Sequence, residues 1–290
     1  MTMDIETMQY YLRVIQEGTI SGAARALHIA QPALSRRMKE LEEELGVQLF
    51  VRGNRKIVLS DEGVILRKRA EEIIRLMHIA EDELLQAKER VAGTVRIGAG
   101  ESRSFSLLAK TAGELMAEYP DIRIHITSGD TQDLLEELDK GLIDCAVIFT
   151  NVDHTAYQAI PLPEEDRFGV LLRKDHPLAQ KEELTFEDLQ NVPVMVSRAS
   201  ESWFSSVSGD NALNVIGTYN LIYNASLLVE NRVCCALAFD GLINTTGDSM
   251  LCFRPLVPVL SIRGSLIRRK YQPASPALQH FIDRLQNRFK

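Results

Sequence analysis

Residues 21–55 read SGAARALHIAQPALSRRMKELEEELGVQLFVRGNR, and this stretch decides the fold of the first part of the chain. A helix is predicted to begin at Gln31-Pro32, because proline suits the first helical position, where its missing N–H needs no partner. The apolar residues then recur on one side of the helix at Leu34, Met38, Leu41 and Leu45. The polar side near its start carries Gln31, Ser35, Arg36 and Lys39.

Two further helices are predicted upstream of it. Residues 4–16 place apolar side chains three and four positions apart, which is the spacing of one face of a helix. Gly18 ends that helix, and Ser21 is expected to be the N-cap of a second short one. The order of helix, tight turn and helix is that of a helix-turn-helix.

The exposed face of the third helix has the chemistry of major-groove reading. Gln31 and Arg36 can each make bidentate contacts to base edges, to adenine and guanine respectively. Ser35 and the N–H groups of the helix start suit phosphates. The alternative at this point is a small helical bundle with a solvated polar face.

A basic hairpin is predicted directly after the third helix. Gln48–Phe50 and Lys56–Leu59 read as two short strands around the turn dipeptide Gly53-Asn54. Arg52 and Arg55 lie at its tip, where they can touch the DNA backbone or minor groove. A hairpin in this position predicts a winged helix-turn-helix, so residues 1–60 form the first predicted domain.

These residues resemble the N-terminal signature of LysR-type transcriptional regulators. The resemblance rests on about 18 positions spread over residues 21–55, among them Ala23, Ala24, Leu27, Gln31, Ala33, Ser35, Met38, Leu41, Glu42, Leu45, Gly46, Leu49, Phe50, Arg52 and Arg55. It implies that the contacts to bases and phosphates come from Gln31, Pro32, Ser35, Arg36 and Arg55. We add Ser21, Lys39 and Arg52 to the predicted DNA-binding set.

A long helix follows, capped by Ser60 and carrying Asp61 and Glu62 in its first turn, where acids suit the helix dipole. Its apolar residues recur every three and four positions, which is a heptad seam. The seam comprises Leu66, Ala70, Ile73, Met77, Ala80 and Leu84. A dimer through this helix is favoured over a single amphipathic helix, and the resemblance likewise implies a dimerising linker helix, here 61–92.

The rest of the chain, 93–290, alternates strands and helices. Strands at 94–98, 122–126 and 143–149 flank helices at 104–118 and 131–140, an order that predicts a mostly parallel sheet. Further strands are predicted near 167–173, 193–197, 215–219, 235–239 and 251–257, and a final helix at 275–289. The fold class is therefore α/β behind an all-α winged helix-turn-helix head.

This second part is also similar to the LysR-type effector domain, whose fold is shared with periplasmic solute-binding proteins. The landmarks are Tyr119-Pro120-Asp121, Gly141-Leu142-Ile143-Asp144 and Asp175-His176-Pro177-Leu178. The resemblance implies two lobes, the first about 93–165 and 266–290 and the second about 166–265. One departure stands out, because a Gly-x-Gly stretch usual in the family is replaced here by Arg232 and Cys234.

A small ligand is expected in the cleft between the two lobes. Gly98-Ala99-Gly100 lacks the rest of a dinucleotide fingerprint, so we expect no nucleotide cofactor. We expect the start of the following helix, with Ser102, to hold a polar or anionic group. By the resemblance, Ser102 and Thr131 are similar to effector-contacting residues, and Ser197 and Arg198 belong to the facing lobe. A helix start with an arginine opposite favours an anionic ligand such as a small carboxylate, although a neutral ligand fits nearly as well. Trp203 and Phe204 are expected to pack in the core.

Composition limits the remaining functions. The formal net charge is −7, yet residues 1–69 hold 11 of the 33 Lys and Arg and 9 of the 40 Asp and Glu, net +2. Only this part has the positive balance that nucleic acid favours. No signal peptide or membrane span is expected, which predicts a cytoplasmic protein. The scattered histidines predict no metal site, and we find no motif typical of an enzyme.

The sequence therefore predicts a DNA-binding regulator that responds to a small-molecule effector. Expected partners are double-stranded DNA, a second copy in a dimer or a dimer of dimers, the effector and RNA polymerase. One alternative is a redox-responsive regulator using Cys234 and Cys235, although adjacent cysteines form at best a strained disulfide. The other is a solute-binding receptor or an enzyme built on the two lobes, against which the basic helix-turn-helix argues.

Overall fold

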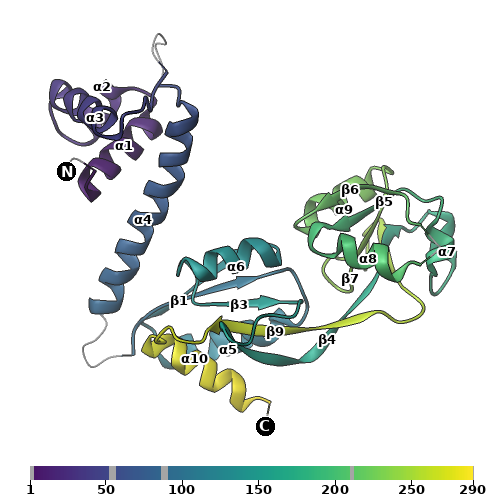
Figure 1. Cartoon of the computed structure of the whole chain (residues 1–290). Coiled ribbons are helices and arrows are strands. Elements are labelled where there is room, and N and C mark those ends of the chain that lie inside the picture. The colour runs from purple at the N-terminus through teal and green to yellow at the C-terminus, as the bar shows by residue number, and fades with distance from the viewer. Residues whose placement is uncertain (1–2, 52–56, 86–90, 210–211, 290) are drawn as a thin grey trace. The chain divides into compact units, whose positions relative to one another are not determined.

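The computed structural model describes residues 3–51, 57–85, 91–209 and 212–289, except for the side chains of residues 82–85. The chain forms two compact units, Met1–Ala87 and Lys88–Lys290, each described here by itself. Figure 1 shows a helical first unit and a second unit in which helices pack around strands. None of the described helices combines the length and the apolar character needed to span a bilayer.

Three helices build the head of the first unit: α1 (Ile5–Glu17), α2 (Ile20–Ala26) and α3 (Gln31–Leu45). The Asp4 side chain caps α1 by accepting a hydrogen bond from the Thr7 N–H. The prediction that Ser21 caps α2 is wrong. Thr19 does so, because its extended backbone brings its hydroxyl oxygen within 3.0 Å of the Gly22 nitrogen, whereas Ser21 already lies inside the helix.

The core of the head is formed by the inward residues of all three helices. Tyr11, Leu34, Met38 and Leu41 are almost completely buried in it. The wing is less regular than predicted, since its described part has a single antiparallel bridge, Phe50 to Leu59, in place of two strands. The Glu42 carboxylate accepts hydrogen bonds from the Leu49 and Phe50 N–H groups and so fixes the base of the wing to α3.

The long helix α4 (Asp61–Leu85) begins as predicted, with the Ser60 hydroxyl accepting a hydrogen bond from the Gly63 N–H. Tyr11 donates to the Gly63 carbonyl oxygen at 2.7 Å, which ties α1 to α4. The helix was predicted to reach residue 92, but Val91 is not helical. The physical reason is tertiary: Val91 packs against the core of the second unit.

The first lobe of the second unit has a parallel core of three strands in the order β2 (Ile122–Ser128), β1 (Gly93–Ala99), β3 (Cys145–Ile148). These strands alternate along the chain with α5 (Phe105–Glu118) and α6 (Thr131–Asp139). The final helix, α10 (Pro276–Asn287), returns to this lobe and buries Phe281 and Leu285 in its core. The second unit thus starts and ends in the same lobe (Figure 1).

The second lobe repeats this arrangement. Its strands β6 (Val215–Tyr219), β5 (Val194–Ser197) and β7 (Cys235–Phe239) are parallel, and β8 (Leu251–Pro255) pairs separately with β4. The helices of this lobe are α7 (Phe186–Leu189), α8 (Glu201–Val207) and α9 (Ile222–Glu230). Phe204 lies in its core, as predicted.

Two long strands, β4 (Tyr157–Arg173) and β9 (Ser261–Arg269), join the lobes (Figure 1). They pair antiparallel, with a register shift between Pro161 and Glu165. The sequence predicted only the end of β4 and missed β9, because Arg263, Gly264 and Ser265 interrupt its apolar pattern. The sheet is therefore mixed and not mostly parallel, since β9 pairs antiparallel with both β3 and β4.

Candidate functional site

The start of α3 is an open, polar surface. Gln31, Pro32, Arg36 and Lys39 are exposed and Ser35 is half-buried, while the other side of the helix is in the core. The N-cap residue, Ala30, supplies no side-chain hydrogen bond to the helix start. Pro32 has no N–H, and the Ala33 N–H donates to the Ala30 carbonyl oxygen at 3.0 Å. Within the described residues the Gln31 N–H therefore remains for an external acceptor such as a phosphate oxygen.

Both cations of this surface pair with an acid one turn later. Arg36 Nε lies 2.8 Å from Glu40 Oε1, and Lys39 Nζ lies 3.2 Å from Glu43 Oε1. Exposed pairs at this spacing contribute only about 0.3–0.5 kcal/mol, so a phosphate or a base edge can displace the acid. Ser21 is exposed on α2, whereas Arg52 and Arg55 lie outside the described residues.

The predicted seam of α4 divides between two environments. Leu66 packs against the core of the head and Ala70 is fully buried. Farther along, Ile73 is 38% exposed, Met77 is half-buried and Ala80 is exposed. The side chain of Leu84 lies outside the described residues. The seam beyond the head therefore presents apolar surface that the described residues of the first unit leave uncovered.

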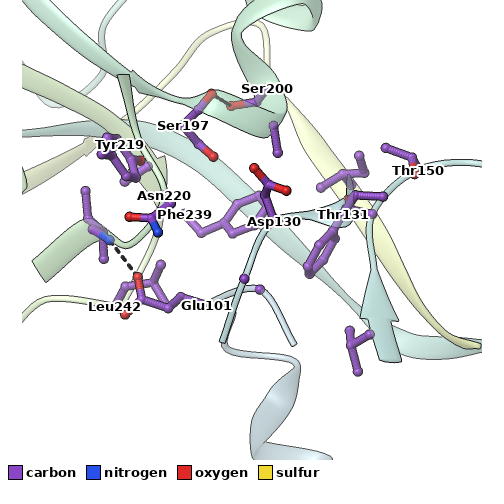
Figure 2. A pocket seen from close by; sticks show the side chains of 18 of the residues that line it. Glu101, Asp130, Thr131, Thr150, Ser197, Ser200, Tyr219, Asn220, Phe239 and Leu242 are labelled. Carbon is purple, nitrogen blue, oxygen red and sulfur yellow. Dashed lines mark hydrogen bonds between the residues drawn. The ribbon is translucent and has the colours of Figure 1, made fainter. Parts of the chain in front are cut away.

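A cavity of about 170 Å³ lies in the second unit, lined by residues of both lobes (Figure 2). Two of the predicted effector residues, Thr131 and Ser197, line it. Ser102 and Arg198 are not among its lining residues. A cavity of roughly 150 Å³ can hold benzene, so this one suits a molecule built on about one ring.

The start of α5 differs from the expectation of free N–H groups. Asp166, on β4, accepts hydrogen bonds through Oδ1 from the Arg103 N–H at 2.7 Å and the Ser104 N–H at 3.4 Å. The Ser102 hydroxyl bonds to the Ser104 hydroxyl at 3.1 Å. The helix start is therefore filled by a carboxylate of this chain, which sequence analysis did not foresee because Asp166 lies more than sixty residues away.

Arg198 is bound to acids of the opposite lobe. Its guanidinium pairs with Asp130 through Nε at 2.5 Å and with Asp133 at 2.7 Å. Burial alone would raise the pKa of Asp130, but the Asp133 N–H and Arg198 outweigh it, so the pKa lies below its usual value. Asp130, which caps α6, is thus ionised at neutral pH, and Arg198 neutralises it.

Glu101 is a cavity residue that the sequence analysis missed. It follows β1 in the first lobe, and its Oε2 accepts a hydrogen bond from the Ile222 N–H at 2.6 Å, at the start of α9 in the second lobe (Figure 2). Glu101 and Asp130 are the charged residues among those lining the cavity, all of which belong to the described part of the chain. No lysine, arginine or histidine is among them.

Aromatic side chains form much of the cavity wall. Phe168 lies 4.9 Å from Trp203 and 4.4 Å from Phe239, and Phe149 lies 5.1 Å from Phe239, measured between ring centroids. All four line the cavity. Trp203 packs against the core of the second lobe, as predicted, but the same ring also faces the cavity.

The departure at Arg232 and Cys234 lies away from the cavity, which neither residue lines. Arg232 has a φ of +65°, the left-handed conformation that favours glycine, so the backbone there keeps the geometry typical of glycine. Its guanidinium pairs with Asp175, which also binds Arg173. These two arginines, Arg173 foremost, lower the pKa of Asp175 to about 2.

Sequence models of two families together match nearly the whole chain. The model described as bacterial regulatory helix-turn-helix protein, lysR family, matches residues 5–64, and that of the LysR substrate binding domain matches residues 88–290. The chain belongs to the LysR family of transcriptional regulators. This LysR-family protein is thus a DNA-binding regulator with an effector-binding domain, of a family that is not enzymatic.

Individual relatives agree with this assignment. The chain is 33% identical over 239 residues to the HTH-type transcriptional regulator BsdA of Bacillus subtilis, covering 80% of this chain and 76% of BsdA. It is 28% identical over 187 residues to the dual regulator OxyR of Escherichia coli, covering 64% and 61%. The fold is that of the LysR-family regulator CbnR, with a TM-score of 0.77 at 17% identity over 99% of this chain and 100% of CbnR.

Proposed function

We propose that this LysR-family protein reads a specific operator through α3 and the wing, and that a small effector in the cavity of the second unit modulates its DNA binding. The observation that carries the first half is the open start of α3, with Gln31 and Arg36 exposed and no capping side chain. CbnR, which has the same fold, is known in complex with its target DNA. Such a regulator acts on the chromosome, in the cytoplasm.

Operator discrimination tests this reading. Gln31→Ala and Arg36→Ala should each reduce the preference for the operator over unrelated DNA by about 1–3 kcal/mol, if each makes a bidentate contact to a base. Arg55→Ala should weaken binding to all sequences alike. Arg13→Ala, on α1 and paired with Glu17, is the matched control. Footprints that stay unchanged in the Gln31 and Arg36 variants would refute the role of α3.

The regulator should act as a dimer formed through α4 beyond the head. Ile73, Met77 and Ala80 form the uncovered part of the seam, and a second copy of the same helix would bury it. A dimer aligns two α3 helices with the two halves of an operator. A dimer of dimers, and contact with RNA polymerase on bound DNA, extend the same proposal.

The effector should bind among Thr131, Ser197 and the aromatic wall of the cavity. Ser102 and Arg198 do not line the cavity: the Ser102 hydroxyl bonds to that of Ser104, and Arg198 pairs with Asp130 and Asp133. Thr131→Ala should abolish the response of operator binding to the effector and leave the affinity without effector unchanged. Thr127→Ala, a threonine of β2 that does not line the cavity, is the control.

The redox alternative is disfavoured by the cysteines. Cys145, Cys234, Cys235 and Cys252 are all buried and free. Burial raises the pKa of each thiol, that of Cys235 to about 12, so the reactive thiolate is scarce at neutral pH. The proposal predicts that Cys234→Ser and Cys235→Ser variants regulate normally.

A further inference from the structure

We infer that the cavity takes a cation: a small molecule with a protonated amine on a body of about one ring, its amine held by Glu101. The inference rests on the proposed effector cavity and names the chemical class that it selects. Three features support it. They are the occupation of the helix starts around the cleft, the charges of the cavity wall, and its aromatic lining.

The helix starts near the cleft, the natural binding sites for an anion, are filled by carboxylates of the chain itself. Asp166 accepts hydrogen bonds from the start of α5, Asp130 caps α6, and Glu101 accepts the first N–H of α9. A ligand carboxylate would have to displace one of these acids or lie beside it. The remaining helix at the cavity, α8, has only seven residues and a correspondingly small dipole.

The charges that line the cavity are negative. Asp130 is neutralised by Arg198, whose guanidinium also binds Asp133. Glu101 has no comparable partner, because Oε2 accepts a backbone N–H and Oε1 has no hydrogen bond within the described part of the chain. Glu101 is half-buried, so its charge acts in a medium less polar than water. A ligand cation would complete this site, and a second anion would be repelled.

The apolar wall matches such a ligand. Phe168 contacts Trp203 and Phe239, with ring centroids 4.9 and 4.4 Å away, and all three line the cavity together with Phe149. Aromatic faces attract cations through the ring quadrupole and also bury a ring of the ligand. Figure 2 shows Glu101, Asn220 and Phe239 among the side chains that line the pocket, so its wall combines a carboxylate with aromatic rings.

Three matched probes separate the charge classes on the full-length protein: phenethylamine, phenethyl alcohol and phenylacetate. They share the phenyl ring and differ in charge. Trp203 is the only tryptophan and lines the cavity, so its fluorescence reports binding there, with calorimetry as the second measurement. We expect the amine to bind at least tenfold more tightly than either other probe. An amine that binds no more tightly than phenylacetate, or does not bind, overturns the inference.

Glu101→Gln tests the named residue. The glutamine oxygen can still accept the Ile222 N–H, so α9 keeps its cap, but the charge is lost. We expect at least tenfold weaker amine binding, about 1.4 kcal/mol, and an unchanged affinity for phenethyl alcohol, which also shows that the cavity is intact. Glu201→Gln, exposed on α8 and not lining the cavity, should bind the amine normally. Unchanged amine binding in Glu101→Gln overturns the inference.

Operator binding, measured with each probe present, separates this inference from the proposed function. Phenylacetate that binds in the cavity and alters operator affinity, while the amine does not bind, overturns the charge class and leaves the effector cavity standing. An amine that binds through Glu101 without any change in operator affinity supports the charge class. The same result would contradict the proposed function, in which ligand binding in the cavity changes the affinity for the operator.

Discussion

The N-terminus of α3 differs from the N-termini of α5, α6 and α9 in whether a side chain of the protein binds its N–H groups. At α3 the N-cap residue Ala30 gives no side-chain hydrogen bond, and the polar residues beside it face outward. At α5, α6 and α9 a carboxylate of the same chain accepts the hydrogen bond of the helix start. The same backbone feature is left for a partner in one unit and used internally in the other.

This difference indicates what each unit can bind. An open helix start with nearby cations attracts a polyanion. The cations Arg36 and Lys39 form only weak, exposed ion pairs with Glu40 and Glu43, which a phosphate can replace. A helix start bonded to a carboxylate has fewer donors left for a ligand, and the carboxylate adds a negative charge to its surroundings. The first unit therefore suits DNA phosphates, whereas the cavity of the second unit disfavours the small carboxylate that the sequence suggested.

The largest effect is expected for a change in the first unit, at the seam of α4. Changing Ile73 and Met77 together to Asp would place two charges in a seam that dimerisation desolvates, so the dimer should be lost. Losing the second binding module costs about 10²–10⁴-fold in overall affinity for a two-part operator. Analytical ultracentrifugation and a binding titration measure both losses.

His78→Asp is the control for this change, because it adds a charge about 100° around α4 from Met77. It should leave the dimer intact. If the double variant still sediments as a dimer, α4 does not form the dimer interface. The seam of α4 is then not a surface that the first unit leaves open for a partner.

A smaller effect, on the stability of the second unit, is expected for a change at the start of α5. Asp166→Ala would leave the Arg103 and Ser104 N–H groups without their acceptor, and an unpaired buried donor costs about 1–3 kcal/mol. The free energy of unfolding of the second unit, from urea denaturation, should fall by that amount. Asp166→Asn should retain most of the stability, since its amide oxygen can still accept.

Glu164→Ala is the matched control, since Glu164 is exposed two residues earlier on β4. Its stability should equal that of the unchanged protein. If the Asp166→Ala variant is as stable as the unchanged protein, the start of α5 does not need the Asp166 carboxylate. The comparison with α3 would then rest on α6 and α9 alone.

The smallest effect should be a gain at α3. Glu40→Gln frees Arg36 from an exposed pair worth about 0.3–0.5 kcal/mol, so operator affinity should rise about twofold. Glu17→Gln, which frees Arg13 on α1 in the same way, should change the affinity less. Fluorescence anisotropy at low salt resolves the difference. A decrease for Glu40→Gln would mean that Glu40 positions Arg36 for the DNA.

The parts of the molecule that follow from local pattern were predicted well. The bounds of α3, the cap at Ser60 and the outward face of Gln31 and Arg36 depend on residues within one or two helical turns. Periodicity reports which side of a helix faces a core, and that is enough for a surface site. The cap of α2 was misplaced by two residues because Thr19 and Ser21 are equally suitable by type, and only the backbone conformation selects one.

The cavity's charge was decided by tertiary structure alone. The three hydrogen bonds that set it join residues 63, 68 and 121 positions apart: Asp166 with Arg103, Asp130 with Arg198, and Glu101 with Ile222. Local pattern shows that a helix starts near Ser102 but not which distant carboxylate will reach its N–H groups. Asp166 reaches the start of α5 because it lies on β4, one of the two strands that join the lobes, and only the folded arrangement of the lobes brings Glu101 to α9 and Asp130 to Arg198.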